Sequence, residues 1–363
     1  MLLPRRSLLA ATTGAILTAP RLARSQTAPG KFKGQTLLVA SWQNYGADDP
    51  ASLRRFEAMT GAKVKNVAFT SEDGLLQMLR QGGLGKIDVV LPNLEYVMTA
   101  AAGSLLQPID ESRVRTWASL EKRFRDLSSI HHGGKLYAVP WVQGATSLAV
   151  NPELVKPVPT SWKVLWDPAN KGKVAFFDDP TTAVMTAALY LGEDPQKPDL
   201  GRVRKALLDL KGNVKLFWSS ADDWNKAYAT GAITMGNLWS GLAGTLKANG
   251  HPLDFILPTE GTVIWGDTWA IAKDAPHLDL AYEWVNFLTS KAYFVEWITH
   301  PGPNQELAVP VNLAAIEALP KKAADSLLAY QLAHYSGPVA LQTGISPQQL
   351  KAWTNLWEEV KAY

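Results

Sequence analysis

The sequence predicts an α/β protein built from two domains of the same kind. Short apolar strands alternate with helices over residues 36–102, and the same alternation returns over residues 173–257. Strands separated by helices pair in parallel and are covered by helices on both faces. The chain has 363 residues, 47% of them apolar, which exceeds a typical single domain and can supply two cores.

The first block reads as a β-α-β-α-β-α series. Asp49 followed by Pro50 is typical of a helix start, and Gly61 and Gly103 are typical of helix ends. We expect strands at residues 36–41, 63–68 and 87–91, and helices at about 50–60, 71–81 and 93–102.

The second block repeats this pattern, and the last third of the chain is mostly helical. We expect strands at 173–177, 214–218, 233–239 and 255–257, with helices at 181–191, 199–211, 221–230 and 241–249. Helices at 278–289 and 292–299 follow, then a Pro/Gly loop at 300–311 and further helices to residue 363.

Two extended segments lie between the αβ blocks, at residues 145–151 and 267–273. Each is a strand of small and apolar residues, and no long linker accompanies it. We expect these paired strands to cross between the two domains and to form a hinge that closes on a ligand.

The N-terminus predicts export. Arg5 and Arg6 precede an apolar run at 8–19, and Ala23-Arg24-Ser25 reads as a small-x-small cleavage site. This is a secretory signal over residues 1–25, cleaved near Ser25 and too short to span a membrane. The paired arginines before Ser-Leu-Leu also resemble a twin-arginine signal. No second run is long enough to span, so we expect a soluble periplasmic protein.

Removing this segment changes the charge of the chain. It carries four arginines and no acid, so 36 basic against 33 acidic residues becomes 32 against 33. The basic pI therefore belongs to the targeting segment and is no sign of nucleic-acid binding. The absence of Cys excludes disulfides, thiolate metal sites and a lipid anchor on Cys.

Four tryptophans stand where strands or short loops should end: Trp42, Trp141, Trp239 and Trp265. Two of them lie near aspartates. Ring faces attract positive charge and a carboxylate fixes an ammonium group, so aromatic residues beside acids predict a site for an organic cation. Trp141 could equally buttress the hinge. Helical tryptophans with apolar neighbours predict packing instead: Trp284, Trp297, Trp353 and Trp357.

Several stretches resemble a known family over most of the chain. They include SWQNY, IDVVLPN, YAVPWVQGATSLAVN, SWKVLWDPANKGKVAFFDD, GNLWSG and PTEGTVIWGDTWAIAKDA. The chain is similar to the periplasmic spermidine/putrescine-binding proteins of ABC importers, within the family 1 extracellular solute-binding proteins.

The resemblance implies a type II periplasmic-binding-protein fold. Two lobes, each a mostly parallel sheet flanked by helices, would enclose a ligand cleft. One lobe would comprise residues 26–148 with 268–311, and the other 149–267 with 312–363. The implied function is capture of a small amine-bearing solute, with a polyamine favoured, and delivery to an inner-membrane ABC permease.

The resemblance also implies the ligand-binding residues. Trp42 and Tyr45 match an aromatic wall of the first lobe, Trp239 a ring beneath the methylene chain, and Asn93 a polar contact. Carboxylate roles fall to Asp179 and Asp267, the latter paired with Trp265. Methylenes bury against rings, and each charged end needs a carboxylate because a dry, unpaired ammonium is costly.

Local alternatives exist for some of these residues. Asp179 precedes Pro180 and a helix, so it also fits a helix cap. Asp267 also fits a hydrogen bond within a hinge strand. Glu95 fits a solvated acid of a helix first turn.

Three departures from the family pattern bear on the ligand, and one of them is the stretch LAVPVN, which stands in the loop before the last helices where the family usually has a Tyr. Thr182 stands where spermidine binders usually have an acid, and Glu95 stands where they usually have an aromatic residue. One carboxylate is lost and another is gained. The alternatives to a polyamine are an amino acid, 4-aminobutyrate, an opine or a quaternary amine, with Thr182 and Ser41 as possible donors.

The motifs do not favour an enzyme. No H-E-x-x-H, G-x-S-x-G or phosphate-binding loop is present, and the six His are scattered. A distant alternative is an exported hydrolase that uses paired carboxylates. We expect a monomeric binding protein without cofactor, metal or nucleic-acid partner.

Overall fold

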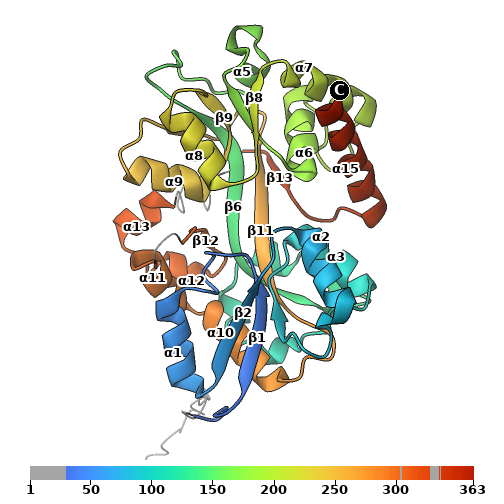
Figure 1. The fold of residues 1–363 in the computed structure, drawn as a ribbon, viewed down its shortest axis with the longest axis vertical. Coiled ribbons are helices and arrows are strands. Elements are labelled where there is room, and N and C mark those ends of the chain that lie inside the picture. The colour runs from blue at the N-terminus through green and yellow to red at the C-terminus, as the bar shows by residue number, and fades with distance from the viewer. Residues whose placement is uncertain (1–29, 303–304, 328–334, 336) are drawn as a thin grey trace, which may run out of the picture.

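Two long strands, β6 (Ala138–Val150) and β11 (Thr262–Ile271), run antiparallel along the middle of the molecule and join its two halves (Figure 1). The structure is a computed structural model, and it describes residues 30–302, 305–327, 335 and 337–363. The predicted signal segment, 1–25, lies outside these residues. No helix in the described ranges has the length and apolarity needed to cross a bilayer.

The first lobe is the half that contains the N-terminal strands. Its parallel strands are β1 (Thr36–Ser41), β2 (Lys63–Ala68) and β3 (Val89–Val90), in the sheet order β2-β1-β3-β11. Its helices are α1 (Pro50–Thr60), α2 (Glu72–Met78), α3 (Leu94–Ala102), α4 (Lys122–Arg125), α10 (Leu278–Leu288) and α11 (Lys291–Thr299). A two-stranded ribbon joins β4 (His131–His132) to β5 (Lys135–Leu136).

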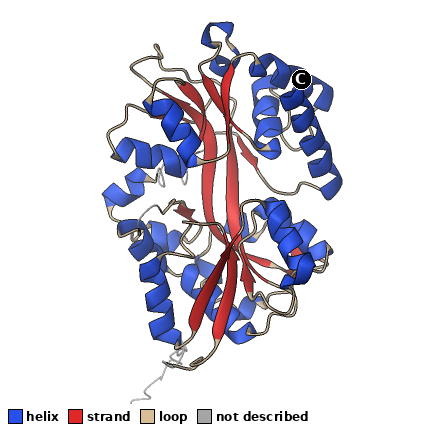
Figure 2. Cartoon of the chain, in the orientation of Figure 1, coloured by secondary structure: helices blue, strands red, loops and turns tan. Residues whose placement is uncertain are grey.

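The second lobe repeats this plan on the other side of β6. Its strands are β7 (Val174–Phe177), β8 (Val214–Trp218), β9 (Met235–Trp239) and β10 (Asp254–Ile256), and the sheet continues in the order β6-β9-β7-β8. Its helices are α5 (Lys163–Trp166), α6 (Pro180–Leu191), α7 (Leu200–Lys211), α8 (Ala221–Ala229), α9 (Ser240–Ala248) and α15 (Pro347–Ala362). Helices flank the strands on both sides in each half (Figure 2). The predicted α/β class and two-lobed architecture are confirmed.

The segment after α11 lies along the seam between the halves. It contains β12 (Val309–Pro310), α12 (Leu313–Ile316), α13 (Lys321–Ser326) and β13 (Val339–Leu341). β12 pairs with β6, and β13 pairs with β11. The sequence predicted a loop for β12 and helix for β13, and both predictions were wrong. Each strand is only two or three residues long and gains its hydrogen bonds from a strand distant in sequence.

The strongest local signals gave accurate element bounds. Asp49 accepts from the backbone N–H of Ser52 at 2.8 Å, Pro50 opens α1, and Gly61 ends it with φ of 79°. The predicted strands at 36–41 and 63–68 are confirmed. The helix predicted over 71–81 ends as an α-helix at Met78 and continues as a π-helical turn over Leu79–Gly83.

Both crossing strands begin earlier than predicted, β6 by seven residues and β11 by five. The first half of β6 contains Pro140 and Gly144, two residues that are uncommon inside strands. Pro140 has no N–H to donate to a neighbouring strand. It pairs with Thr268 of β11, where the register between the two strands shifts. The antiparallel pairing of β6 with β11 holds the remainder extended.

A cluster of tryptophans fills the core of the first lobe. Trp141 stacks on Trp297 with ring centroids 5.4 Å apart, and Trp269 meets Trp284 edge to face at 5.8 Å. Each is at most 1% exposed. Trp353 and Trp357 of α15 are equally buried in the second lobe. The predicted packing roles of the helical tryptophans are confirmed.

Candidate ligand-binding site

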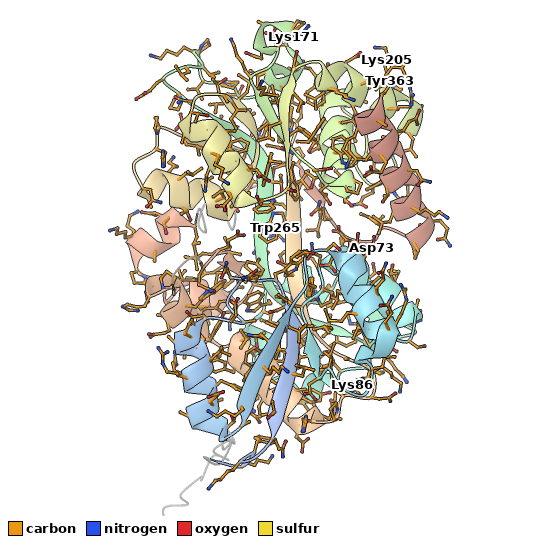
Figure 3. All side chains as sticks on the ribbon, in the orientation of Figure 1. Asp73, Lys86, Lys171, Lys205, Trp265 and Tyr363 are labelled. Carbon is orange, nitrogen blue, oxygen red and sulfur yellow. The ribbon has the colours of Figure 1, made fainter. Side chains whose placement is uncertain are left out.

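A cavity of about 650 Å³ lies between the two lobes, against the crossing strand β11. Trp265 stands at the middle of the molecule where the halves meet, and Asp73 marks the side of α2 (Figure 3). All nine residues predicted from the sequence line this one cavity: Trp42, Tyr45, Asn93, Glu95, Asp179, Thr182, Trp239, Trp265 and Asp267. Strand ends and helix starts from both lobes therefore converge here.

Trp265 reaches the cavity because its neighbour on β6 has no side chain. In the pairing of β11 with β6, Trp265 lies opposite Gly144. A Cβ atom at Gly144 would lie 2.2 Å from Cζ2 of the indole, so the ring occupies the space above this glycine. The indole is half-buried, and its Nε1 has no hydrogen-bond partner among the described residues.

Two further tryptophans form aromatic walls, one from each lobe. Trp42, just after β1, meets Phe69 at a centroid distance of 4.6 Å. Trp239 ends β9 and is held edge to face between Phe177, at 4.9 Å, and Trp218, at 4.8 Å. Edge-to-face packing fixes a ring while leaving one face open, which suits cation–π contact with a ligand.

Asp267 lies on β11, two residues from Trp265, and is 5% exposed. Its Oδ2 accepts a hydrogen bond from the Tyr45 hydroxyl at 2.7 Å. Burial raises the pKa of Asp267 from 3.8 to about 7, although the bond from Tyr45 opposes the rise. With a pKa near 7, the carboxyl group of Asp267 can lose its proton and become negatively charged when a cation binds beside it.

Asn93 joins Asp267 to a second acid, Glu72. The amide nitrogen of Asn93 faces both carboxyl groups, because the reverse orientation would set its oxygen against acceptors only. It donates to Asp267 Oδ1 at 2.8 Å and to Glu72 Oε1 at 2.7 Å, and the Asn93 backbone N–H donates to the same Glu72 oxygen at 3.0 Å. Burial raises the pKa of Glu72 well above its ordinary value, and the nearby Asp267 adds to the rise.

Glu95 and Asp179 line the cavity from opposite lobes. Glu95, in the first turn of α3, is 5% exposed rather than solvated; burial and then the charge of Asp179 hold its pKa well above the ordinary value. Asp179 caps α6, accepting from the Thr182 backbone N–H at 2.6 Å, and burial raises its pKa as well. It both caps the helix and lines the cavity. The Thr182 hydroxyl accepts from Gln342 Nε2 at 2.9 Å.

The cavity is strongly acidic. Eight described lining residues carry carboxyl groups and one is basic: Glu72, Asp73, Glu95, Asp178, Asp179, Asp267, Glu306 and Glu358 against Lys361. The Lys361 ammonium lies 2.8 Å from Asp178 and 2.9 Å from Glu358, so it is already paired. The remaining carboxyl groups face the cavity without a protein cation among the described lining residues.

Glu306 is an acid on the seam between the lobes. Its backbone N–H donates to the Asn44 carbonyl of the first lobe at 2.8 Å. The next carbonyl, of Leu307, lies against Gly241 at the start of α9, where a Cβ would be only 2.1 Å away. Burial raises the pKa of Glu306, and Asp222 adds to the rise.

Glu72, Glu306, Phe69, Phe177 and Gln342 were missed from the sequence. Glu72 follows the capping Ser71 and therefore read as a helix-start acid, and Glu306 was hidden in the Pro/Gly loop. The sequence did contain one indication that Glu72 could belong to the site, since this acid begins the helix that follows strand β2. Ser41 does not line the cavity.

Trp141 also stays outside the cavity. It is fully buried, and its Nε1 donates to the Leu288 carbonyl at 2.9 Å. The buttressing role is therefore the one that the structure supports.

The groups that line the cavity suit an organic cation. Within the described ranges, no cluster of three or more His, Cys, Asp or Glu residues has metal-binding geometry. Aromatic faces beside separated carboxyl groups fit an organic cation with methylene groups.

Relatives with known roles match most of the chain. A spermidine/putrescine-binding periplasmic protein of Escherichia coli K12 is 29% identical over 296 residues, covering 80% of this chain and 83% of the relative. The putrescine-binding periplasmic protein PotF of the same organism is 30% identical over 275 residues, covering 70% of this chain and 73% of the relative.

Solved structures share the fold. The spermidine/putrescine ABC transporter substrate-binding protein PotD of Streptococcus pneumoniae superposes with a TM-score of 0.73 at 21% identity, covering 91% of this chain and 99% of that one. A structure described as the Atu4243 GABA receptor gives 0.73 at 23% identity, with 90% and 97% covered. Similarity at this level shows the architecture and leaves the ligand open.

The family model for bacterial extracellular solute-binding proteins matches residues 51–328, which include both crossing strands and most of the acidic residues of the cavity. By this match, by the relatives and by the fold, the chain belongs to the bacterial extracellular solute-binding proteins.

Proposed function

We propose that this protein captures a polyamine, putrescine or spermidine, in the periplasm and delivers it to an inner-membrane ABC permease. The observation that carries the proposal is the charge of the cavity: eight carboxyl groups and one paired lysine around half-buried tryptophans. A ligand with several ammonium groups is what such a lining can neutralise.

The contacts available are sufficient for tight binding. Each cation–π contact with Trp42, Trp239 or Trp265 contributes about 1–2 kcal/mol when desolvated. Charge-assisted hydrogen bonds to Asp179, Asp267 and Glu95 add to this. After the cost of ordering the ligand and closing the lobes, micromolar or tighter affinity is expected.

The names of the relatives support the same ligand class, since both curated relatives bind putrescine or spermidine. An amino acid, 4-aminobutyrate or an opine carries a carboxylate of its own, which would face an acidic lining. The one basic lining residue among those described, Lys361, already contacts two carboxylates. A quaternary amine would leave most of the acids without a hydrogen-bond donor.

The remaining parts of the proposal follow from this role. Residues 1–25 would be removed on export, whether by the twin-arginine or the general route. Lobes formed by residues 26–148 with 268–311 and by 149–267 with 312–363 would close about β6 and β11. The protein would act as a monomer, without nucleic acid, cofactor or catalysis.

A thermal-shift screen of the protein without residues 1–25 tests the proposal. Endogenous ligand is first removed by unfolding and refolding, and the panel includes putrescine, spermidine, 4-aminobutyrate, betaine, basic amino acids and anions. A ligand at a hundredfold its Kd adds about 2.7 kcal/mol of stability. Stabilisation by di- and triamines alone is the expected result, and recovery of the amine unchanged separates binding from hydrolysis. Stabilisation by zwitterions or single-charge amines would overturn the polyamine assignment.

A further inference from the structure

Glu72 is an acid of the first lobe that the resemblance did not point to. It is the first residue of α2, only 6% exposed, and it lines the cavity. Its Oε1 accepts twice from Asn93, through the backbone N–H and the side-chain amide. Its Oε2 is buried and has no hydrogen-bond partner among the described residues. A buried carboxylate oxygen without a donor is costly unless something else supplies one.

The second carboxyl group of this pair, Asp267, is close by. The Asn93 amide nitrogen lies 2.7 Å from Glu72 Oε1 and 2.8 Å from Asp267 Oδ1, so these two oxygens are separated by at most about 5.5 Å, the sum of both distances. An ammonium nitrogen that contacts two carboxylate oxygens at about 2.8 Å each spans up to about 5.6 Å between them. Since the Asn93 amide nitrogen already lies between these two oxygens, an ammonium would contact both carboxyl groups from the cavity side, where Glu72 Oε2 is free to accept from it.

The groups that donate hydrogen bonds to this pair are neutral, while the carboxyl groups of Glu95 and Asp73 add further negative charge nearby. Asn93 contributes an amide, and Tyr45 contributes the hydroxyl that binds Asp267 Oδ2. No Arg or Lys other than Lys361 lines the described part of the cavity, and Lys361 is paired elsewhere. Two carboxyl groups this close repel one another when both are charged, and a shared cation removes that repulsion.

A purely structural role does not account for the acid at this position. The Asn93 backbone N–H needs one acceptor oxygen, and the neutral amide of a glutamine would supply it at lower desolvation cost. The charge of Glu72 suits the start of a helix, but its second oxygen has no partner among the described contacts.

We infer that Glu72 is a ligand-binding residue and that one ammonium group of the ligand is held between Glu72 and Asp267. The inference rests on the proposed function, since it requires an amine ligand. It makes Glu72 of the first lobe the partner of Asp267, on the crossing strand β11, at a single cationic end. Glu95 and Asp179 remain available for another end.

Calorimetric titration of putrescine into the protein, Glu72→Gln, Asp267→Asn and the double variant tests the inference. Glutamine keeps the acceptor for Asn93 and removes only the charge. We expect Kd for putrescine to rise tenfold or more in Glu72→Gln. Because both acids hold one group, the double variant should lose clearly less than the product of the two single losses. Glu111→Gln, on an exposed glutamate of the first lobe away from the cavity, should match the unmodified protein.

Two results would overturn the inference. If the unmodified protein binds putrescine and Glu72→Gln binds it equally well, Glu72 is not in the site, while the proposed function stands. If the single losses multiply in the double variant, the two acids do not share one ammonium. Absence of any amine binding by the unmodified protein would remove the proposed function and this inference together. Should the glutamine variant fail to fold, Glu72→Asp replaces it: a fivefold or greater loss supports the role, and unchanged affinity overturns it.

Discussion

Two groups of tryptophans in this molecule differ in their surroundings: those in the core of the first lobe and those that line the cavity between the lobes. In the core, Trp141 lies stacked on Trp297 with no exposed surface. In the cavity, Trp239 and Trp265 are half-buried and share their space with carboxyl groups. The comparison teaches that ring type and position after a strand do not decide the role. The groups around the ring decide its role. Asp267 lies two residues from Trp265, whereas Trp141 packs against other rings.

The largest effect on stability is expected when a tryptophan of the first-lobe core is replaced by a small residue. Trp141→Ala is expected to lower the free energy of unfolding by about 3–5 kcal/mol, because it opens a large cavity among fully buried rings. Chemical denaturation measures this. Where the variant remains folded, its affinity for putrescine should stay within about threefold. A large loss of affinity at unchanged stability would instead make Trp141 part of the site.

A change of pH should act on the cavity and not on the tryptophan core. The pKa of Asp267 is about 7 in the folded protein against an ordinary 3.8, so the folded state binds more protons than the unfolded state between these values. Stability of the ligand-free protein should therefore fall as pH rises from about 4 to 7, by on the order of 4 kcal/mol.

Urea denaturation at pH 5 and pH 8 measures this loss, and Asp267→Asn is the control that should reduce it. Saturating putrescine should reverse the loss, because the cation favours the charged carboxyl group. A ligand-free protein that becomes more stable over this range would contradict the assignment.

Asp267→Asn should also separate binding from packing. Removing the charge is expected to weaken putrescine binding at least tenfold, about 1.4 kcal/mol, while the asparagine retains an acceptor for the Tyr45 hydroxyl. Titration calorimetry gives the affinity, and circular dichroism checks the fold. Equal affinity of the variant and the parent would remove Asp267 from the site.

The smallest expected effect concerns one ring of the cavity. Trp239→Leu keeps apolar surface but removes the π face, so we expect about a fivefold loss of putrescine affinity, or about 1 kcal/mol. Trp239→Phe should retain part of it. If Trp239→Leu binds putrescine as tightly as the unmodified protein, the ring of Trp239 contributes only apolar contact. The difference between cavity and core tryptophans would then be smaller.

Prediction from sequence succeeded where the signal is local. The bounds of α1 follow from Asp49, Pro50 and Gly61, each acting within one turn of its neighbours. The full extent of β6 was not predicted, because its first half contains Pro140 and Gly144 and is paired with β11, a strand distant in sequence. β13 needed a partner strand about 75 residues away, which no local pattern reveals.

The same distinction holds for the site. Trp265 and Asp267 are neighbours on one strand, so their spacing was visible in the sequence. Glu72 becomes part of the site only through Asn93, 21 residues further along the chain. Locally it is an ordinary acid at the start of a helix, and only the fold brings its carboxyl group to Asp267.

The crossing strands have a kinetic consequence. Trp265 and Asp267 belong to β11, one of the two strands that join the lobes, whereas Glu95 and Asp179 stand on helices of opposite lobes. In any rotation of the lobes about these strands, atoms near the axis move least and atoms at the rim move most. An arriving ligand would therefore meet Trp265 and Asp267 already in place, so they would govern the association rate. Glu95 and Asp179 would arrive only with closure and would govern the time that the ligand stays.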